Sequence, residues 1–309
     1  MLRGRYKGQL LDTRDRRSVR LLEGEEAKPY LRDPADIVIR NFYHEGKFWT
    51  ARFLPESVEA VYFQKVRMKT RVPAAHAQIR FQLKKGKEAE LFSADGSVPR
   101  DPKITDVVYS VEAMPVYGDK YDLYNGTQDH FGLGLRIMSI QEAYSKSIYA
   151  NDQHVGQILL SVVEKAEQVL LKEAFVRSDE LGMDQMYNTI IRSCCTESFR
   201  LLDRSSARTW LRMPGYGLVV LPMLPRTYLY MRGLIDFKTL LRNPTPSLEV
   251  EFAHLKNTEW WVERLAQLKA RDAADREAFL ARMKRVKDRC DLDAFAHRND
   301  GDQEWWGKE

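Results

Sequence analysis

The chain has few of the residues on which disulfide-rich, metal-binding and membrane-spanning proteins depend. Its 309 residues include only three cysteines and six histidines. Three thiols cannot build a full disulfide framework, and the adjacent Cys194 and Cys195 are poorly placed to pair with each other. Zinc sites usually need cysteine pairs spaced C-x₂₋₄-C with further ligands, and the chain has no such pair. We therefore expect no disulfide framework and no metal centre.

Long apolar runs and glycine-rich loops are also missing. The most apolar stretch, residues 213–235, is interrupted by three prolines and two arginines, so no membrane-spanning helix is predicted. The one glycine-rich spot, Gly132 to Gly134, lacks the spacing of a phosphate-binding loop, and no cofactor is expected. No apolar segment follows the basic start of the chain as a signal peptide would require. This leaves a cytoplasmic protein or one whose targeting segment is not part of this chain.

Charge does not single out a partner. The 49 basic and 44 acidic residues leave a net charge of +5, so the total gives no indication of a nucleic-acid partner. The 44% apolar content and the many aromatic residues indicate a folded protein with a large core. The sequence thus predicts a globular protein of one or two domains.

Strand patterns occupy the first half of the chain and helical patterns the second. Alternation is clearest from His76 to Leu83, and further strands are predicted at 37–42, 48–53, 60–63, 107–113 and 133–140. A helix is predicted from Val155 to Leu170, another from about residue 195, and a long charged helix from about 258 to 289. This order predicts an α+β fold with an N-terminal arm (1–35), a central domain (36–245) and a C-terminal helical extension (246–309).

The two adjacent cysteines are the strongest chemical signal. They stand where a helix is expected to begin, and free N–H groups and the positive end of the helix dipole favour a thiolate there. Successive helical positions diverge by about 100°, so both cannot face the core. Ser193 is the expected helix cap. We expect a nucleophilic cysteine, Cys194 or Cys195, with backbone N–H groups that can stabilise an oxyanion.

His76 is the candidate base. It shares one face of its predicted strand with Gln78, Arg80 and Gln82, and such a polar face meets water or lines a cleft. A carboxylate on a neighbouring strand, Glu112, is the candidate that orients the imidazole. Isolated strand histidines and glutamates are more often structural or solvated than catalytic. Further candidates near a cleft are His44 and His130, and Arg80 and Arg136 as ligands of an anionic head group, although strand arginines usually face solvent.

Three segments together resemble the Lnb N-terminal periplasmic domain family. They are the strand from Ala74 to Phe81, the Ser110-Val111-Glu112-Ala113 run, and the segment from Tyr187 to Thr196. The family's patterns look like "AH…F", "S-x-E-A" and "YN…NC-x-T", and ungapped placement puts the family's cysteine on Cys194. The resemblance covers roughly residues 36–235.

The resemblance implies a permuted papain-like (NlpC-type) core, an antiparallel sheet packed against helices, and a lipoprotein N-acyltransferase activity. By implication Cys194 attacks a diacylglyceryl ester to form an acyl-thioester, His76 is the base, and Glu112 orients it. A lipid or lipoprotein substrate, a peripheral membrane surface and a periplasmic or membrane-peripheral location follow; a cytoplasmic location is the alternative. Two other hypotheses stay open: a cysteine peptidase or amidase using the same pair, and a non-enzymatic scaffold.

Overall fold

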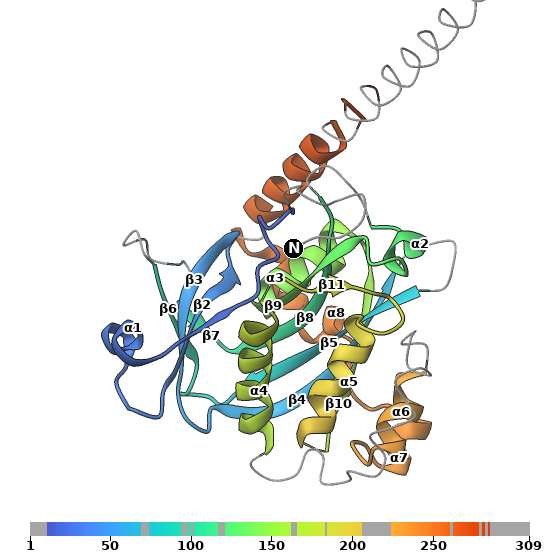
Figure 1. Cartoon of the computed structure of the whole chain (residues 1–309). Helices are drawn as coiled ribbons and strands as arrows, with labels where there is room; N and C mark the ends of the chain where they lie inside the picture. Colours follow the sequence, from blue (N-terminus) through green and yellow to red (C-terminus); the bar gives the residue numbers. More distant parts are fainter. Residues whose placement is uncertain are drawn as a thin grey trace, which may run out of the picture.

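A single large mixed sheet forms the centre of the protein (Figure 1). The computed structural model describes residues 11–68, 74–93, 97, 99, 102–116, 121–161, 166–182, 184–205, 224–259, 262–277, 280, 281 and 284. The sheet has eleven strands, nine of them in the order β10-β4-β5-β8-β9-β2-β3-β6-β7. All neighbouring pairs are antiparallel except β2 and β9. The predicted α+β class is therefore confirmed.

The strands predicted from the sequence lie within longer strands of this sheet. The central members are β4 (Val58–Met68), β5 (Ala74–Leu83), β8 (Asp106–Met114) and β9 (Phe131–Ser139). On one side follow β2 (Ile37–His44), β3 (Lys47–Phe53), β6 (Ala89–Phe92) and β7 (Lys103–Ile104). Two short strands, β1 (Arg20–Leu22) and β11 (Met186–Tyr187), pair with β2 and β9. The segment predicted as an arm thus contributes a strand, followed by α1 (Gly24–Ala27) and η2 (Lys28–Tyr30).

The helix predicted from Val155 to Leu170 is wrong in its first part. Residues His154–Leu159 form the edge strand β10, antiparallel to β4, and the helix α4 begins only at Ala166 and ends at Leu181. Gln157 is fully buried in this strand and hydrogen-bonds to Gln64 on β4. The strand therefore buries a polar side chain, and this hides the apolar alternation that would have marked it as a strand.

Helices pack on both faces of the sheet. On one face α4 and α5 (Cys194–Ser205) supply apolar side chains to the main core, where Phe175 and Phe199 pack against strand phenylalanines. On the other face α3 (Ile140–Tyr144) and α8 (Leu248–Glu251) cover a smaller core. Glu197 is fully buried and forms ion pairs with Arg177 and Arg200. Burial of this carboxylate is possible because both of its oxygens are paired with arginines.

Shorter elements complete the described structure. They are α2 (Leu123–Gly126), the π-helical turn η3 (Ser145–Ala150), α6 (Pro225–Met231), α7 (Phe237–Leu241) and η5 (Ala253–Asn257). The apolar stretch 213–235 is described only from Leu224 onward. None of the described helices combines the length and the apolar composition that crossing a membrane requires.

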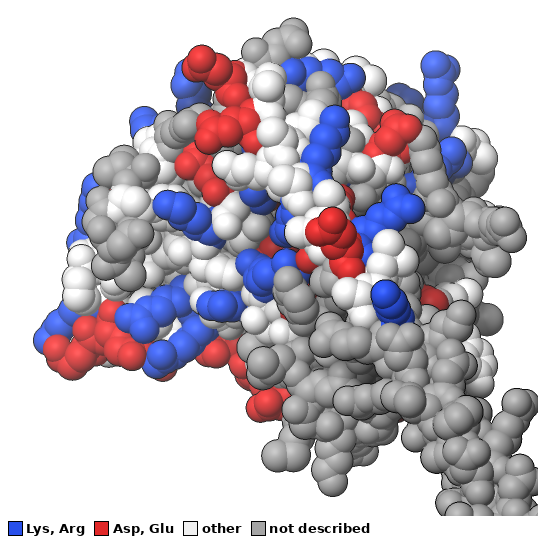
Figure 2. Space-filling view, turned by 90° about the horizontal axis from the view of Figure 1, so that it is seen from above, with Lys and Arg blue, Asp and Glu red and all other residues white. Residues whose placement is uncertain are grey.

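A C-terminal helix over residues 262–277 docks on the sheet domain through ion pairs (Figure 1). Arg264 reaches Glu142 at 2.9 Å, and its guanidinium lies so close to Gly46 that a Cβ there would be 2.6 Å from Nη1. Arg271 bonds to Asp15 at 3.1 Å. In the described part of the face shown in Figure 2, basic and acidic side chains are interspersed.

Candidate active site

The start of α5 places its two cysteines in different environments. Ser193 caps the helix: its hydroxyl accepts from the N–H of Thr196 at 3.3 Å, and the Thr196 hydroxyl accepts from the N–H of Ser193 at 2.8 Å. Cys194, the first helical residue, is 7% exposed and lines a cavity. Cys195 is fully buried in the main core, where burial raises the pKa of its thiol well above the ordinary value. Only Cys194 therefore offers its sulfur to the cavity.

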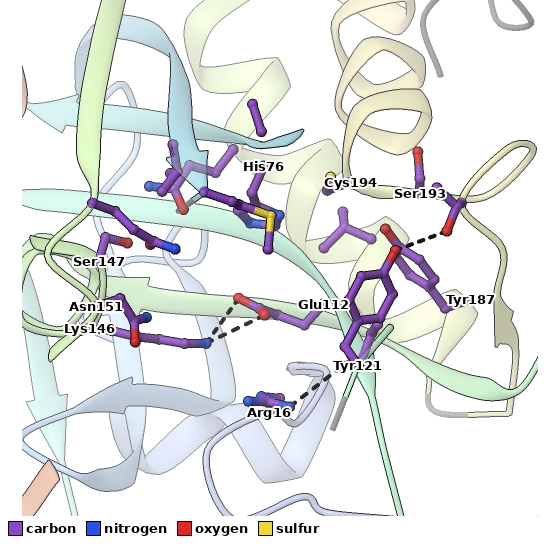
Figure 3. Close-up of a pocket in the computed structure, with 18 of the residues that line it drawn as sticks. Arg16, His76, Glu112, Tyr121, Lys146, Ser147, Asn151, Tyr187, Ser193 and Cys194 are labelled. Carbon is purple, nitrogen blue, oxygen red and sulfur yellow. Dashed lines mark hydrogen bonds and ion pairs between the residues drawn. The ribbon is translucent and has the colours of Figure 1, made fainter. Parts of the chain in front are cut away.

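His76 lies on β5 beside this sulfur (Figure 3). The two side chains lie close enough to shift each other's pKa, although 118 positions separate them along the chain. The contact depends on α5 packing across β5, with the beginning of β5, where His76 lies, near the start of the helix. The fold thus joins the two residues that the sequence singled out as nucleophile and base.

A second contact fixes the imidazole from its other side. Nε2 of His76 lies 2.7 Å from Oγ of Ser110, and that hydroxyl donates to Oε1 of Glu112 at 3.0 Å. The hydroxyl has a single hydrogen, which it gives to Glu112, so it accepts from a protonated Nε2. Nδ1 is consequently the nitrogen left for the sulfur of Cys194. This is the tautomer that a base acting on that thiol needs.

This relay corrects one detail of the sequence-based hypothesis. Glu112 was expected to orient His76 directly, but Ser110 stands between them, so the carboxylate acts on the ring through a hydroxyl. The register explains the arrangement: Gln78 pairs with Ser110, which puts Ser110 and Glu112 on the face of β8 beside His76. Lys146, from η3, approaches both Glu112 oxygens at 3.4 Å.

The charges of this cluster favour an ion pair between sulfur and ring. Burial opposes ionisation of Cys194, but the charge and hydrogen bond of His76 outweigh it and lower the pKa of the thiol. Burial likewise opposes charging of His76, and the interaction with Cys194, together with Glu112, raises the pKa of the ring. Glu112 is itself buried, yet Lys146 and His76 hold its pKa well below the ordinary range. Burial lowers the pKa of Lys146 to about 8.

Hydrogen-bond donors surround the thiol. The backbone N–H of Ala77 and the hydroxyl of Tyr187 lie beside Cys194 and help to lower the pKa of its thiol. Of the four N–H groups at the start of α5, those of Ser193 and Thr196 bond within the cap, and that of Cys194 lies near the Tyr187 oxygen. Within the described residues the fourth, that of Cys195, has no hydrogen-bond partner. This N–H and the Tyr187 hydroxyl are suited to hold a developing oxyanion.

The cavity in front of Cys194 has a volume of about 450 Å³ (Figure 3). Its apolar lining comes from β4, β5, β8, β9 and α2, namely Val66, Met68, Ala75, Val111, Ala113, Met138 and Leu123. Its polar end is formed by Arg16, Lys146, Ser147, Asn151, Gln153 and Gln78. Pockets of this size and mixed lining are typical of sites for small molecules or for one acyl chain.

The other candidates do not reach the cavity. His44 is fully buried and bonds to Ser139 at 2.8 Å, and His130 bonds to Asn125. Arg80 and Arg136, expected to face solvent or an anionic ligand, are each 1% exposed: the first pairs with acidic side chains and the second stacks on Tyr43. The third cysteine, Cys290, lies outside the described residues.

The sequence reasoning missed several residues of the site, among them Tyr187, which it named only as part of a motif. Ser110 and Gln78 could have been found, because each stands two residues from a singled-out residue on the same strand face. Arg16 and Lys146 carry no such signal, since they come from an irregular N-terminal segment and a π-helical turn. Among the described residues, no group of three or more metal-binding side chains occurs.

Comparison with known proteins adds no relative to this geometry: no family model, curated protein or solved structure matches the chain.

Proposed function

We propose that the protein is a thiol-dependent acyltransferase that moves an acyl chain from a lipid or lipoprotein ester to an amine. The observation that carries this proposal is the neighbouring pair of Cys194 and His76 at a helix start, opening on a largely apolar cavity. The order of the two elements, histidine strand before cysteine helix, is consistent with a permuted papain-like core.

The first half-reaction forms an acyl-thioester. The Cys194 thiolate attacks the ester carbonyl, and the negative charge of the tetrahedral intermediate falls on an oxygen held by the N–H of Cys195 and the hydroxyl of Tyr187. The intermediate collapses by breaking the C–O bond. The proton on Nδ1 of His76 passes to the leaving alkoxide, and the ring becomes neutral.

The second half-reaction releases the acyl group. A neutral amine attacks the thioester carbonyl while Nδ1 of His76 takes up its proton, and the C–S bond breaks to give an amide. The enzyme returns to the thiolate and imidazolium pair with which it began. Ser110 and Glu112 keep Nε2 protonated throughout, so Nδ1 alone exchanges protons in both steps.

Features around the cavity support a lipid-bearing substrate at a peripheral membrane surface. Leu123 lines the cavity and is 41% exposed, and its neighbour Tyr124 is 74% exposed. Ile190 and Ile191 are also exposed, in the turn that bonds to α2 through the N–H of Thr189. Exposed apolar side chains beside an apolar cavity are suited to drawing an acyl chain out of a lipid layer. A periplasmic or membrane-peripheral location belongs to this proposal.

A cysteine peptidase or amidase is the second candidate. The observation that favours it is the polar end of the cavity, where Asn151, Gln153 and Ser147 could bind a peptide backbone. Both candidates share the acyl-thioester and differ in what attacks it: an amine in the first and water in the second.

Intact-protein mass spectrometry tests the shared step and then separates the candidates. Incubation with a 4-nitrophenyl alkanoate should add one acyl group to the wild-type protein and to Cys195→Ala, and none to Cys194→Ala. A diacylglyceryl-modified peptide as donor, with an amine present, should then give an amide product. Release of free acid only, with peptide cleavage, would favour the hydrolase; an unmodified wild-type protein would overturn both and leave a binding role.

A further inference from the structure

We infer that the side-chain oxygen of Gln78 receives an N–H of the acyl acceptor and makes the site selective for primary amines over alcohols. This inference rests on the proposed acyl transfer. It names a residue that selects the acceptor. It is carried by a chain of buried amides that runs from the edge strand β10 across β4 to the cavity.

The chain of amides has a fixed direction. The side chain of Gln157 lies between Glu251, which can only accept hydrogen bonds, and Arg80, which can only donate them. Its Nε2 therefore faces Oε2 of Glu251 at 2.7 Å, and its Oε1 faces Nη1 of Arg80 at 2.8 Å. Both ends agree, so the orientation of this amide is not a free choice.

That orientation passes to the next two amides. Nε2 of Gln64 donates to Oε1 of Gln157 at 2.8 Å, and Nε2 of Gln78 donates to Oε1 of Gln64 at 2.7 Å. Gln64 is fully buried and Gln78 is 2% exposed, so neither can exchange these bonds for water at low cost. Nε2 of Gln78 gives one hydrogen to Gln64, and Oε1 remains available as the acceptor of this amide.

The available oxygen belongs to the cavity. Gln78 lines it together with His76, which stands two residues away on the same face of β5. Its amide nitrogen is engaged by Gln64, and within the described residues its oxygen has no hydrogen-bond donor. Because that oxygen can only accept, a molecule that satisfies it must bring a hydrogen.

The acceptor's chemistry decides which molecules can do so. A primary amine attacks with its lone pair and has two hydrogens, one for Nδ1 of His76 and one for Oε1 of Gln78. In the step that follows, the N–C bond forms, the C–S bond breaks and the His76-bound hydrogen leaves as a proton. An alcohol has one hydroxyl hydrogen, which His76 must take, so the Gln78 oxygen would stay buried without a partner.

The role inferred for Gln78 is that of a hydrogen-bond acceptor, whereas an oxyanion needs a donor. Gln78 should therefore act in the second half-reaction and leave the first unchanged.

Competition between two matched acceptors tests this. The acyl-enzyme is formed from a 4-nitrophenyl alkanoate in the presence of equal concentrations of glycinamide and glycolamide. These two acceptors differ only in that one carries an amine where the other carries a hydroxyl. The ratio of amide product to ester product is measured by mass spectrometry. In Gln78→Met the ratio should fall about tenfold, because the amine loses one hydrogen bond, and the nitrophenol burst should be unchanged. Gln64→Met, which frees the amide to turn, should lower the ratio less. Gln82→Met, on the same strand face but outside the cavity, is the control.

The outcomes separate this inference from the proposal beneath it. An unchanged ratio in both Gln78→Met and Gln64→Met, with a normal burst, would overturn the role of Gln78 and leave acyl transfer intact. If Gln78→Met folded but gave no nitrophenol burst, the acceptor role of Gln78 would be overturned in favour of an oxyanion role. If the wild-type protein gave no burst at all, the acyltransferase itself would be refuted.

Discussion

Replacing Ser110 by alanine isolates the contribution of the relay to the reactivity of Cys194. The change removes the hydroxyl between His76 and Glu112, so Nε2 loses its 2.7 Å partner. A hydrogen bond to a charged group contributes about 1.5–3 kcal/mol, and 1.36 kcal/mol corresponds to one pKa unit. The pKa of His76 should fall by about one to two units. Since the imidazolium is what lowers the pKa of the thiol, the pKa of Cys194 should rise by a similar amount.

The pH dependence of iodoacetamide labelling measures this shift. The thiolate is present above the pKa of Cys194 and is lost as the pH falls through it, so the alanine variant should lose reactivity at a higher pH than the wild type. Between the two pKa values its rate should be about 10- to 100-fold lower, and at high pH the rates should converge.

Ser139→Ala is a matched control for this experiment. Ser139 is equally buried and also bonds to a histidine, His44, but that pair lies outside the cavity. The control should lower the melting temperature and leave the labelling profile unchanged. Identical profiles for Ser110→Ala and the wild type would refute the relay.

Three further predictions concern other parts of the site. Cys195→Ala should leave the labelling rate within about twofold of the wild type, because that thiol is buried with a raised pKa; a large loss would assign the nucleophile to Cys195. Glu112→Gln should lower the pKa of Lys146 below its value of about 8, because burial then acts without the opposing charge of the carboxylate. A pH titration of amine labelling, followed by mass spectrometry, measures this pKa, and an unchanged value would refute the pairing. Replacing Ile190 and Ile191 by serine should weaken binding to anionic liposomes severalfold in a sedimentation assay while the nitrophenyl ester burst stays normal; unaltered binding would exclude this turn as a lipid contact.

The sequence was sufficient to predict an element where a single hydrophobic period extends over its whole length. The alternation from His76 to Leu83 predicted both the strand and the face on which the histidine lies, and the adjacent cysteines predicted a helix start. Both cysteines are buried in the core, against the expectation that one would point outward, and Cys194 also lines the cavity. Local pattern suffices in such cases because each residue's direction follows from its neighbours. The approach of His76 to Cys194 itself was only a hypothesis, since the packing of a helix on a distant strand is not written in either segment.

The remaining features could not be predicted because they depend on long-range pairing of polar groups. Arg80 and Gln157 are buried against expectation, and each is tolerable only through partners more than twenty residues away. Strand β10 was mistaken for helix for the same reason: its buried Gln157 interrupts the apolar alternation. The position of Lys146 depends on a π-helical turn that has no clear sequence signature.

Two directional hydrogen-bond chains meet at the cavity, and each begins at a carboxylate. From Glu112 the chain runs through Ser110 to His76, and because a carboxylate only accepts, it keeps Nε2 protonated and leaves Nδ1 as the acceptor of the neutral ring in the acyl-enzyme. From Glu251 the chain runs through Gln157 and Gln64, and for the same reason it presents an oxygen of Gln78. Glu112 and Glu251 thus determine which atoms around the acyl group can accept hydrogens, although neither carboxylate contacts the acyl donor or the acyl acceptor. The two acceptor atoms they create match the two hydrogens of a primary amine.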